Sequence, residues 1–151
     1  MDTSNLRRLP LSGGIDPEER AGLQALGDSA RSYLRDFSWC PHDFTLYLAY
    51  GLPEVIGLFL AEFDAPVGDS DRYLWVVAGD LPEAYFVTDD AQDTRAALLT
   101  YCALMQDWIE AVHRRGPMDE VFPVAAEPCD DNADLLQRRL DFLMLNVVPA
   151  L

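Results

Sequence analysis

The sequence predicts an α+β fold, in which an antiparallel meander of four to five strands carries three packed helices. Apolar residues recur at helical spacing near both ends of the chain and at strand spacing in its centre. The connections between the central strands are short, which favours antiparallel pairing because parallel strands need long crossovers. A length of 151 residues suits one domain. We expect residues 1–15 to be a flexible N-terminal arm and residues 16–151 to form a single α+β domain.

The first expected helix covers residues 16–38. Asp16 is a suitable N-cap, Pro17 suits the first helical position, and Glu19 completes a capping-box pattern. Pro41 prevents the helix from continuing. The apolar stripe of this helix consists of Leu23, Leu26, Ala30, Tyr33, Leu34 and Phe37.

Four strands are expected next, over residues 43–50, 55–63, 72–78 and 84–88. The first alternates in the manner of a strand, and the third is rich in aromatic and β-branched residues, which favour strands. The second is almost wholly apolar, which predicts that both of its faces are covered. Turn-forming sequences with glycine and proline separate the first strand from the second and the third from the fourth.

Two further helices and a short strand complete the predicted fold. A helix follows Asp93 and stops before Gly116 and Pro117, which together form a strong stop signal. Residues 121–125 suit a short edge strand, because proline cannot donate to a central ladder. The last helix starts near Asp131. The two helices have apolar stripes formed by Leu98, Tyr101, Met105, Trp108 and Val112 and by Leu136, Leu140, Leu143 and Val147.

The charge of the chain restricts its partners. There are 26 acidic side chains against 11 arginines and no lysine, so the formal net charge is −15, although 50% of the residues are hydrophobic. The apolar half argues against a disordered acidic tail. The negative field disfavours nucleic acid and anionic membranes and favours basic partners. No run of about 20 apolar residues exists to span a membrane, and residues 1–14 lack the apolar stretch of a secretory signal.

The three cysteines, Cys40, Cys102 and Cys129, do not form a disulfide framework by number or spacing. We therefore expect reduced thiols and a cytoplasmic location. Two histidines and scattered cysteines do not give the paired ligand spacing of a zinc site, and no phosphate-binding loop is present. No metal, no cofactor and no catalytic residue is expected.

A partner-binding surface is predicted on the central strands and the loops beside them. If one face of the sheet is partly open, alternate aromatic residues form a patch with an acidic rim, which resembles protein-binding surfaces. The same residues equally suit caps, hairpin turns and core positions, so both interpretations remain open. The predicted binding residues are Asp69, Asp71, Tyr73, Trp75, Asp80, Asp89 and Asp90.

Two alternatives to a partner-binding protein remain. Trp39, Cys40 and His42 lie close together in sequence, and with sheet residues they predict a pocket for a small ligand or an enzyme of unknown reaction. The commoner meaning of such a segment is a turn with a buried cysteine. The second alternative is a homodimer in which the central aromatic strands pair.

The string YLWVVAGDLPEAY at residues 73–85, with Ser38, Trp39 and Cys40 and the helix after Asp93, resembles a family of small bacterial proteins of uncharacterised function. That resemblance implies no catalytic residues. In general character, the small acidic α+β chain is similar to immunity proteins, which neutralise bacterial toxins. This likeness implies a basic toxin as partner and a non-enzymatic role, in which the acidic protein occludes the basic active site of the toxin.

Overall fold

The computed structural model describes residues 1–68 and 71–151. These residues contain a five-stranded antiparallel sheet and three α-helices, so the predicted α+β class is confirmed. The chain divides into two compact units, residues 1–94 and residues 95–151, and each is described by itself. The single domain over residues 16–151 stays a prediction.

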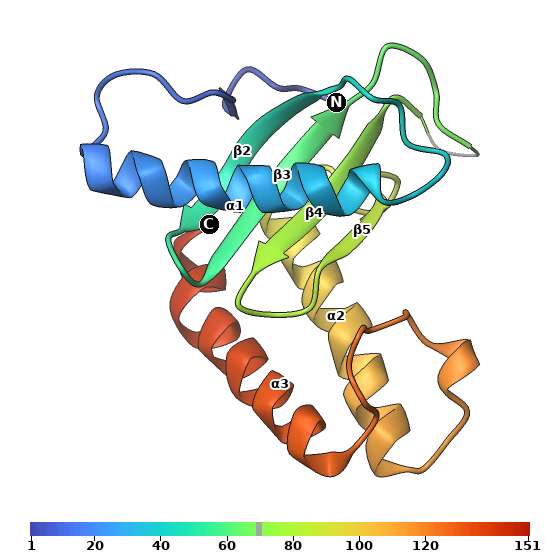
Figure 1. The fold of residues 1–151 in the computed structure, drawn as a ribbon. Helices are drawn as coiled ribbons and strands as arrows, with labels where there is room; N and C mark the ends of the chain where they lie inside the picture. Colours follow the sequence, from blue (N-terminus) through green and yellow to red (C-terminus); the bar gives the residue numbers. More distant parts are fainter. Residues whose placement is uncertain (69–70) are drawn as a thin grey trace. The chain divides into compact units, whose positions relative to one another are not determined.

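The first unit is built on the sheet, whose strands follow one another in chain order (Figure 1). They are β1 (Arg7–Arg8), β2 (Thr45–Leu52), β3 (Ile56–Glu62), β4 (Tyr73–Gly79) and β5 (Ala84–Val87). Each strand pairs antiparallel with the next. The four central strands start and end within two residues of the predicted positions. The first six residues of β3 are all buried, as its apolar sequence predicts.

Helix α1 (Pro17–Arg35) lies across one face of the sheet (Figure 1). Asp16 caps it as predicted, because its Oδ2 accepts hydrogen bonds from the backbone amides of Glu18 and Glu19 at 3.1 and 3.2 Å. The helix contributes Leu23, Leu26, Ala30 and Leu34 to a core whose sheet residues are Leu46, Leu48, Phe59, Ala61, Phe63, Leu74, Val76 and Ala78. Burial of this apolar surface is the main stabilising contribution of the helix.

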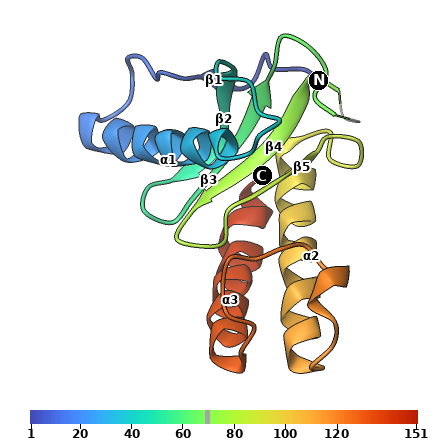
Figure 2. The same cartoon turned by 45° about the vertical axis from the view of Figure 1, so that its right-hand side comes forward.

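The N-terminal segment corrects the prediction of a flexible arm over residues 1–15. Its β1 pairs with β2, as Figure 2 shows. Leu9 and Leu11 are buried, and the amide of Leu11 donates to Oε1 of Gln24 at 3.1 Å. Leu9 fits because Gly27 has no side chain: a Cβ there would lie 2.5 Å from Leu9 Cδ1. Leucine at alternate positions therefore fastens this segment to the sheet and to α1.

The second unit contains two long helices, which run side by side in both views (Figures 1 and 2). They are α2 (Thr94–His113) and α3 (Asp130–Phe142), and α3 continues into a π-helical turn, η2 (Leu143–Val147). All residues of the two predicted apolar stripes are buried. The predicted edge strand at residues 121–125 is wrong, because that segment has no strand structure. The fifth strand of the sheet is β1 instead.

Helix α2 ends in a Schellman motif centred on Arg115. The amide of Arg115 donates to Val112 at 3.1 Å, and the amide of Gly116 donates to Ala111 at 2.9 Å. This pattern requires a left-handed residue at position 115, where φ is +55°. The stop signal was thus placed correctly at Gly116 and Pro117, but an arginine adopts the conformation that glycine usually takes.

Candidate partner-binding site

Six carboxylates of the described residues gather at one end of the sheet. Because neighbouring strands are antiparallel, β2 and β4 begin where β3 and β5 end. We call this the acidic end, and its carboxylates belong to Asp43, Glu62, Asp64, Asp71, Asp89 and Asp90. The opposite end of the same four strands carries Glu54, Asp80 and Glu83.

Glu62 is the carboxylate at this end with the most hydrogen bonds. Its oxygens accept from Tyr73 Oη at 2.7 Å and from Tyr47 Oη at 3.2 Å, and Arg72 Nη2 lies at 3.3 Å. These donors, Tyr73 first, hold the pKa of Glu62 below its usual range. The same bond raises the pKa of Tyr73. Glu62 is therefore a fixed negative charge on a rigid strand.

The structure brings together four of the predicted binding residues. Tyr73 begins β4 at the acidic end, and Oδ1 of Asp71 accepts a hydrogen bond from its backbone amide at 2.8 Å. Oδ2 of Asp71 lies 3.3 Å from Thr88 Oγ1, which ties the start of β4 to the residues after β5. Asp89 and Asp90 follow Thr88 directly and are exposed. These acids thus lie on one end of the sheet.

The other three predicted residues do not join this group. Trp75 is 1% exposed, and its indole N–H donates to the carbonyl of Ala91 at 2.7 Å, so the expectation of an exposed aromatic there is wrong. Its strand is covered on both faces, which the sequence predicted only for the neighbouring strand. Asp80 follows the last residue of β4 at the opposite end of the sheet. Asp69 lies outside the described residues.

A half-buried aromatic cluster lies beside the end of α1. Phe37 meets the ring of Tyr85 edge-on at 4.9 Å and that of Tyr33 at 5.3 Å, and Trp39 lies 5.1 Å from Tyr85 and 6.3 Å from Phe63. Such edge-to-face pairs add to the energy of area burial. Burial, with smaller effects of Tyr85 and Glu83, raises the pKa of Tyr33 to about 12. The cluster fixes Trp39 against the sheet.

Two arginines of α1 hold the segment that carries Trp39. Arg31 donates to the carbonyl of Phe44 at 2.8 Å and places its guanidinium 4.6 Å from the centre of the Phe44 ring. Arg35 Nε donates to the carbonyl of His42 at 3.0 Å. Both bonds reach the same connecting segment, which fixes it relative to the helix and the start of β2.

A pocket of about 270 Å³ opens next to Trp39. Its polar groups include the carboxylates of Asp43 and Asp64, and Trp39 and Pro41 supply aromatic and apolar surface. Residues 65–68 complete the wall. Small-molecule sites usually measure about 300–1,000 Å³, so this pocket is of a size for one side chain. Carboxylates and an indole favour a cation, by ion pairing and by cation–π attraction.

Cys40 and His42 each interact with the residue that follows it in the chain. The Cys40 thiol donates to the carbonyl of Pro41 at 3.4 Å, and burial raises its pKa. His42 is 85% exposed, and its Nε2 lies 3.9 Å from Asp43 Oδ1. A thiol with a raised pKa is a poor nucleophile at neutral pH. This geometry therefore gives no support to an enzymatic role for Cys40 and His42.

The acidic charge is unequally shared between the two units. Residues 1–94 hold 17 acidic side chains and six arginines, and residues 95–151 hold nine and five. The excess of acidic over basic groups is therefore eleven in the first unit and four in the second. The unit with the Trp39 pocket therefore carries the larger share of the negative charge.

The sequence did not identify Glu62 and Asp64 as candidate site residues. It also did not show that Asp43 lines the pocket. The signal was present, because Asp43 opens the first predicted central strand and Asp64 follows the second. Antiparallel pairing of those two strands brings the beginning of one next to the end of the other. The register that pairs Thr45 with Glu62 was needed to see it.

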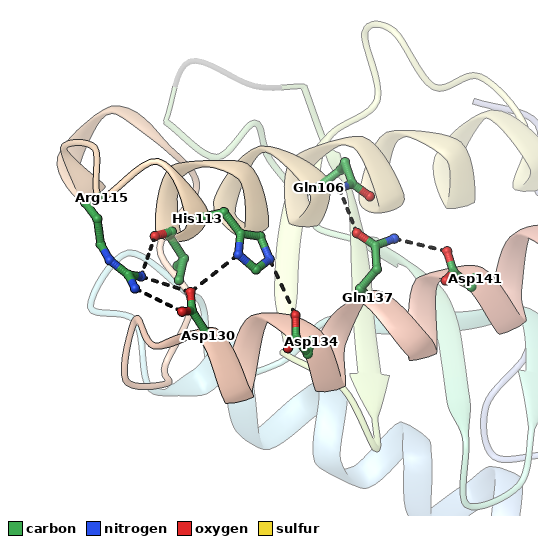
Figure 3. A network of polar contacts seen from close by, with 8 residues as sticks. Gln106, His113, Arg115, Asp130, Asp134, Gln137 and Asp141 are labelled. Carbon is green, nitrogen blue, oxygen red and sulfur yellow. Dashed lines mark hydrogen bonds and ion pairs between the residues drawn. The ribbon is translucent and has the colours of Figure 1, made fainter.

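The second unit has a polar network between α2 and α3, shown in Figure 3. Arg115 donates to both oxygens of Asp130 at 2.9 Å, and the ring nitrogens of His113 lie 3.4 Å from Asp130 and 3.5 Å from Asp134. Arg115 holds the pKa of Asp130 below its usual range. A similar contact joins the helices further along, where Gln106 donates to Gln137 at 2.9 Å. The network ties the end of α2 to the start of α3.

No group of three or more histidine, cysteine or acidic side chains in residues 1–68 and 71–151 is arranged to hold a metal ion. Within the same residues, no helix has the length and apolarity needed to cross a membrane. Comparisons with protein-family models, curated proteins and solved structures find no match. The resemblance to a bacterial family through residues 73–85 stays a prediction.

Proposed function

We propose that this chain is a non-enzymatic acidic binding protein, most concretely an immunity protein that neutralises a bacterial toxin by occluding its basic active site. The observation that carries the proposal is the Trp39 pocket, in which Asp43 and Asp64 flank a half-buried indole at the acidic end of the sheet. A half-buried aromatic anchor with carboxylates beside it is suited to an arginine or lysine side chain of a partner. Three free cysteines suit a reducing cytoplasm.

The proposed mechanism has two stages. The negative field of residues 1–94 first attracts the basic partner, and such steering raises the association rate at low salt. The partner then inserts a cationic side chain beside Trp39, while Glu62, Asp71 and Asp89 face the remaining positive surface. Because β2 to β5 hold these groups in place, little ordering entropy opposes binding.

Affinity capture with matched baits tests the proposal. Three baits are compared in lysate of the native host: the wild type, the pocket variant W39A/D43N/D64N and the control variant D119N/E120Q. The control keeps Trp39 and removes two charges from the 3₁₀ helix Met118–Glu120. We expect the wild type and the control to recover the same basic protein and the pocket variant to lose it. The bound partner should lose its toxic activity.

Salt dependence gives the second readout. Association of the purified partner should slow by at least about tenfold between 50 and 500 mM NaCl, because salt screens the steering field. Recovery of no basic protein, or an association rate that is the same at both salt concentrations, would contradict the proposal.

A small-ligand protein or enzyme with a pocket near Trp39, Cys40 and His42 is the second prediction from the sequence. The pocket does adjoin Trp39, but it is lined by Pro41 and Asp43 rather than by the thiol and the imidazole. A thermal-shift screen of metabolites distinguishes the two functions. Stabilisation that W39A abolishes, without any protein partner, would favour the small-ligand function.

A further inference from the structure

A second pocket, of about 290 Å³, lies in the groove between α2 and α3. Leu99 from α2 and Met144 from η2 both line it and are 37% and 44% exposed, although they are far apart in the sequence. Met144 belongs to the π-helical turn, and such turns are frequent at functional sites. The pocket lies wholly within residues 95–151 and is separate from the one beside Trp39.

The pocket has a polar end and an apolar end. The contact between Gln106 and Gln137 fixes the register of the antiparallel helices α2 and α3 and marks the polar end. The same register places Leu99 opposite Met144 at the apolar end. From Leu99 to Gln106 the helix rises about 10 Å. We therefore expect the occupant to be an elongated molecule with one polar end.

A chain of hydrogen bonds with a fixed direction forms the polar end, as Figure 3 shows. Gln106 Nε2 donates to Gln137 Oε1 at 2.9 Å, and Gln137 Nε2 donates to Asp141 Oδ1 at 3.0 Å. The direction follows from Asp141, because a carboxylate accepts hydrogen bonds and does not donate them. In the part of the chain that the structure describes, Asp141 Oδ2 and Gln106 Oε1 accept no hydrogen bond from another residue. The pocket thus offers two oxygens, one of them on a carboxylate, to a donor.

We propose that this pocket binds a small primary amine, with its ammonium group at Asp141 and its aliphatic chain toward Leu99 and Met144. An ammonium group has three donors and a positive charge, so it suits both open oxygens and pairs with the carboxylate. The aliphatic chain covers apolar surface that is otherwise exposed. An alcohol of the same shape lacks the charge, and an aliphatic carboxylate is repelled by Asp141. The inference does not rest on the proposed function of the Trp39 pocket.

A free amine suits the pocket better than a lysine side chain of a partner protein. The chain of a free amine ends in a methyl group, which packs against Leu99 and Met144 without leaving a polar atom unpaired. A lysine with its ammonium group at Asp141 would bring its backbone amides to the same apolar end. The volume of about 290 Å³ lies just below the usual range of small-molecule sites, so the ligand has a short chain. n-Pentylamine is therefore the probe.

Titration of the full chain with n-pentylamine at pH 7 and 150 mM NaCl tests the proposal, with NMR of ¹³C-labelled methionine methyl groups as the readout. The Met144 signal, identified by its loss in M144L, should shift to saturation with a dissociation constant in roughly the millimolar range. The signal of Met118, which lies in η1 (Met118–Glu120), should not shift. The comparison ligands are 1-pentanol, pentanoate and Nα-acetyllysine methylamide. Each should bind at least about fivefold more weakly, because the first two lack the positive charge and the third has polar atoms at the apolar end.

D141N keeps the shape of the side chain without its charge, so it should weaken binding of n-pentylamine at least about tenfold. D107N is the matched control: it removes the same charge from an exposed residue of α2 outside the pocket, and the affinity should stay within about twofold of the wild type. A103L fills the pocket from a lining residue and should weaken n-pentylamine and 1-pentanol alike. Circular dichroism checks that each variant keeps its helices. A Met144 signal that stays unshifted at 50 mM amine, equal loss in D141N and D107N, or a lysine derivative that binds as tightly as n-pentylamine would each overturn the proposal.

Discussion

Single residues with unusual backbone angles explain how the turns at the end of the sheet opposite Trp39 are built. Gly79 has φ of +139°, and a Cβ there would lie 2.4 Å from the carbonyl oxygen of Val55. The amide of Asp80 donates to the same carbonyl at 2.9 Å. The sequence predicted a turn that begins at Gly79, but only the register of β3 and β4 shows that a side chain is excluded there.

Gly79→Ala should lower the free energy of unfolding by about 2–3 kcal/mol, because it combines a strained φ with a backbone clash. Urea denaturation at pH 7 measures the change. Gly13→Ala serves as the control, since nothing lies within 4 Å of its Cβ position and its φ is not left-handed. A loss of similar size in both variants would contradict this explanation.

Glu62 should make the first unit sensitive to acid. Its pKa is lowered in the folded state, so its contribution to stability is present above the unfolded pKa, near 4.5, and is lost as the pH falls through the folded pKa. Glu62→Gln should therefore flatten the dependence of the urea midpoint on pH below about pH 5. Unchanged curvature in this variant would show that other carboxylates cause the acid sensitivity.

The hydroxyl of Tyr73 provides a complementary test, because it is the main cause of the lowered pKa of Glu62. Tyr73→Phe should cost about 1 kcal/mol at pH 7 and less in acid, below the lowered pKa of Glu62, where that carboxyl is protonated. Tyr50→Phe is the matched control, on strand β2 of the same sheet. It should change the midpoint equally little at both pH values.

The positions of helices and strands were more predictable from the sequence than the pairing between strands. The stripe of Leu136, Leu140, Leu143 and Val147 identified the buried side of α3 and η2 because it depends only on local periodicity. The edge strand was misplaced because Val121 and its neighbours have strand-like composition but no partner strand. Arg7 and Arg8, which do form β1, carry no apolar signal; the burial of Leu9 and Leu11 holds them in place.

Cys102 on α2 should be almost inert to thiol reagents. Burial raises its pKa to about 11, so at pH 8 only about one thiol in a thousand is ionised. Iodoacetamide followed by mass spectrometry should modify the half-buried Cys129 well before Cys102. In 6 M guanidinium all three cysteines should react alike. Rapid labelling of Cys102 in the native protein would show that α2 opens locally.

Half of the residues in the full chain are hydrophobic and can form a core, whereas its net negative charge opposes compactness through self-repulsion. Composition predicted this property, and the preference for basic partners that composition also predicts stays a prediction. Composition could not predict that Asp43 and Asp64 would share a pocket. That fact depends on long-range pairing between strands, which local patterns do not determine.

Self-repulsion should make the protein more heat-stable at high salt. We expect the melting temperature to rise by several degrees between 20 and 500 mM NaCl, since screening weakens repulsion among an excess of fifteen negative charges more than it weakens the few exposed ion pairs. Differential scanning calorimetry measures it. The variant D43N/D64N should show a smaller rise, and a melting temperature that falls with salt would contradict the expectation.

The fastening of Leu9 against Gly27 has a practical consequence for anyone who shortens the protein. A truncation before Asp16 looks harmless from composition, but it would remove β1 and with it the strand that pairs with the outer side of β2. Bare strand edges recruit other molecules and promote aggregation. Expression of such a fragment should therefore yield inclusion bodies where the intact chain remains in solution.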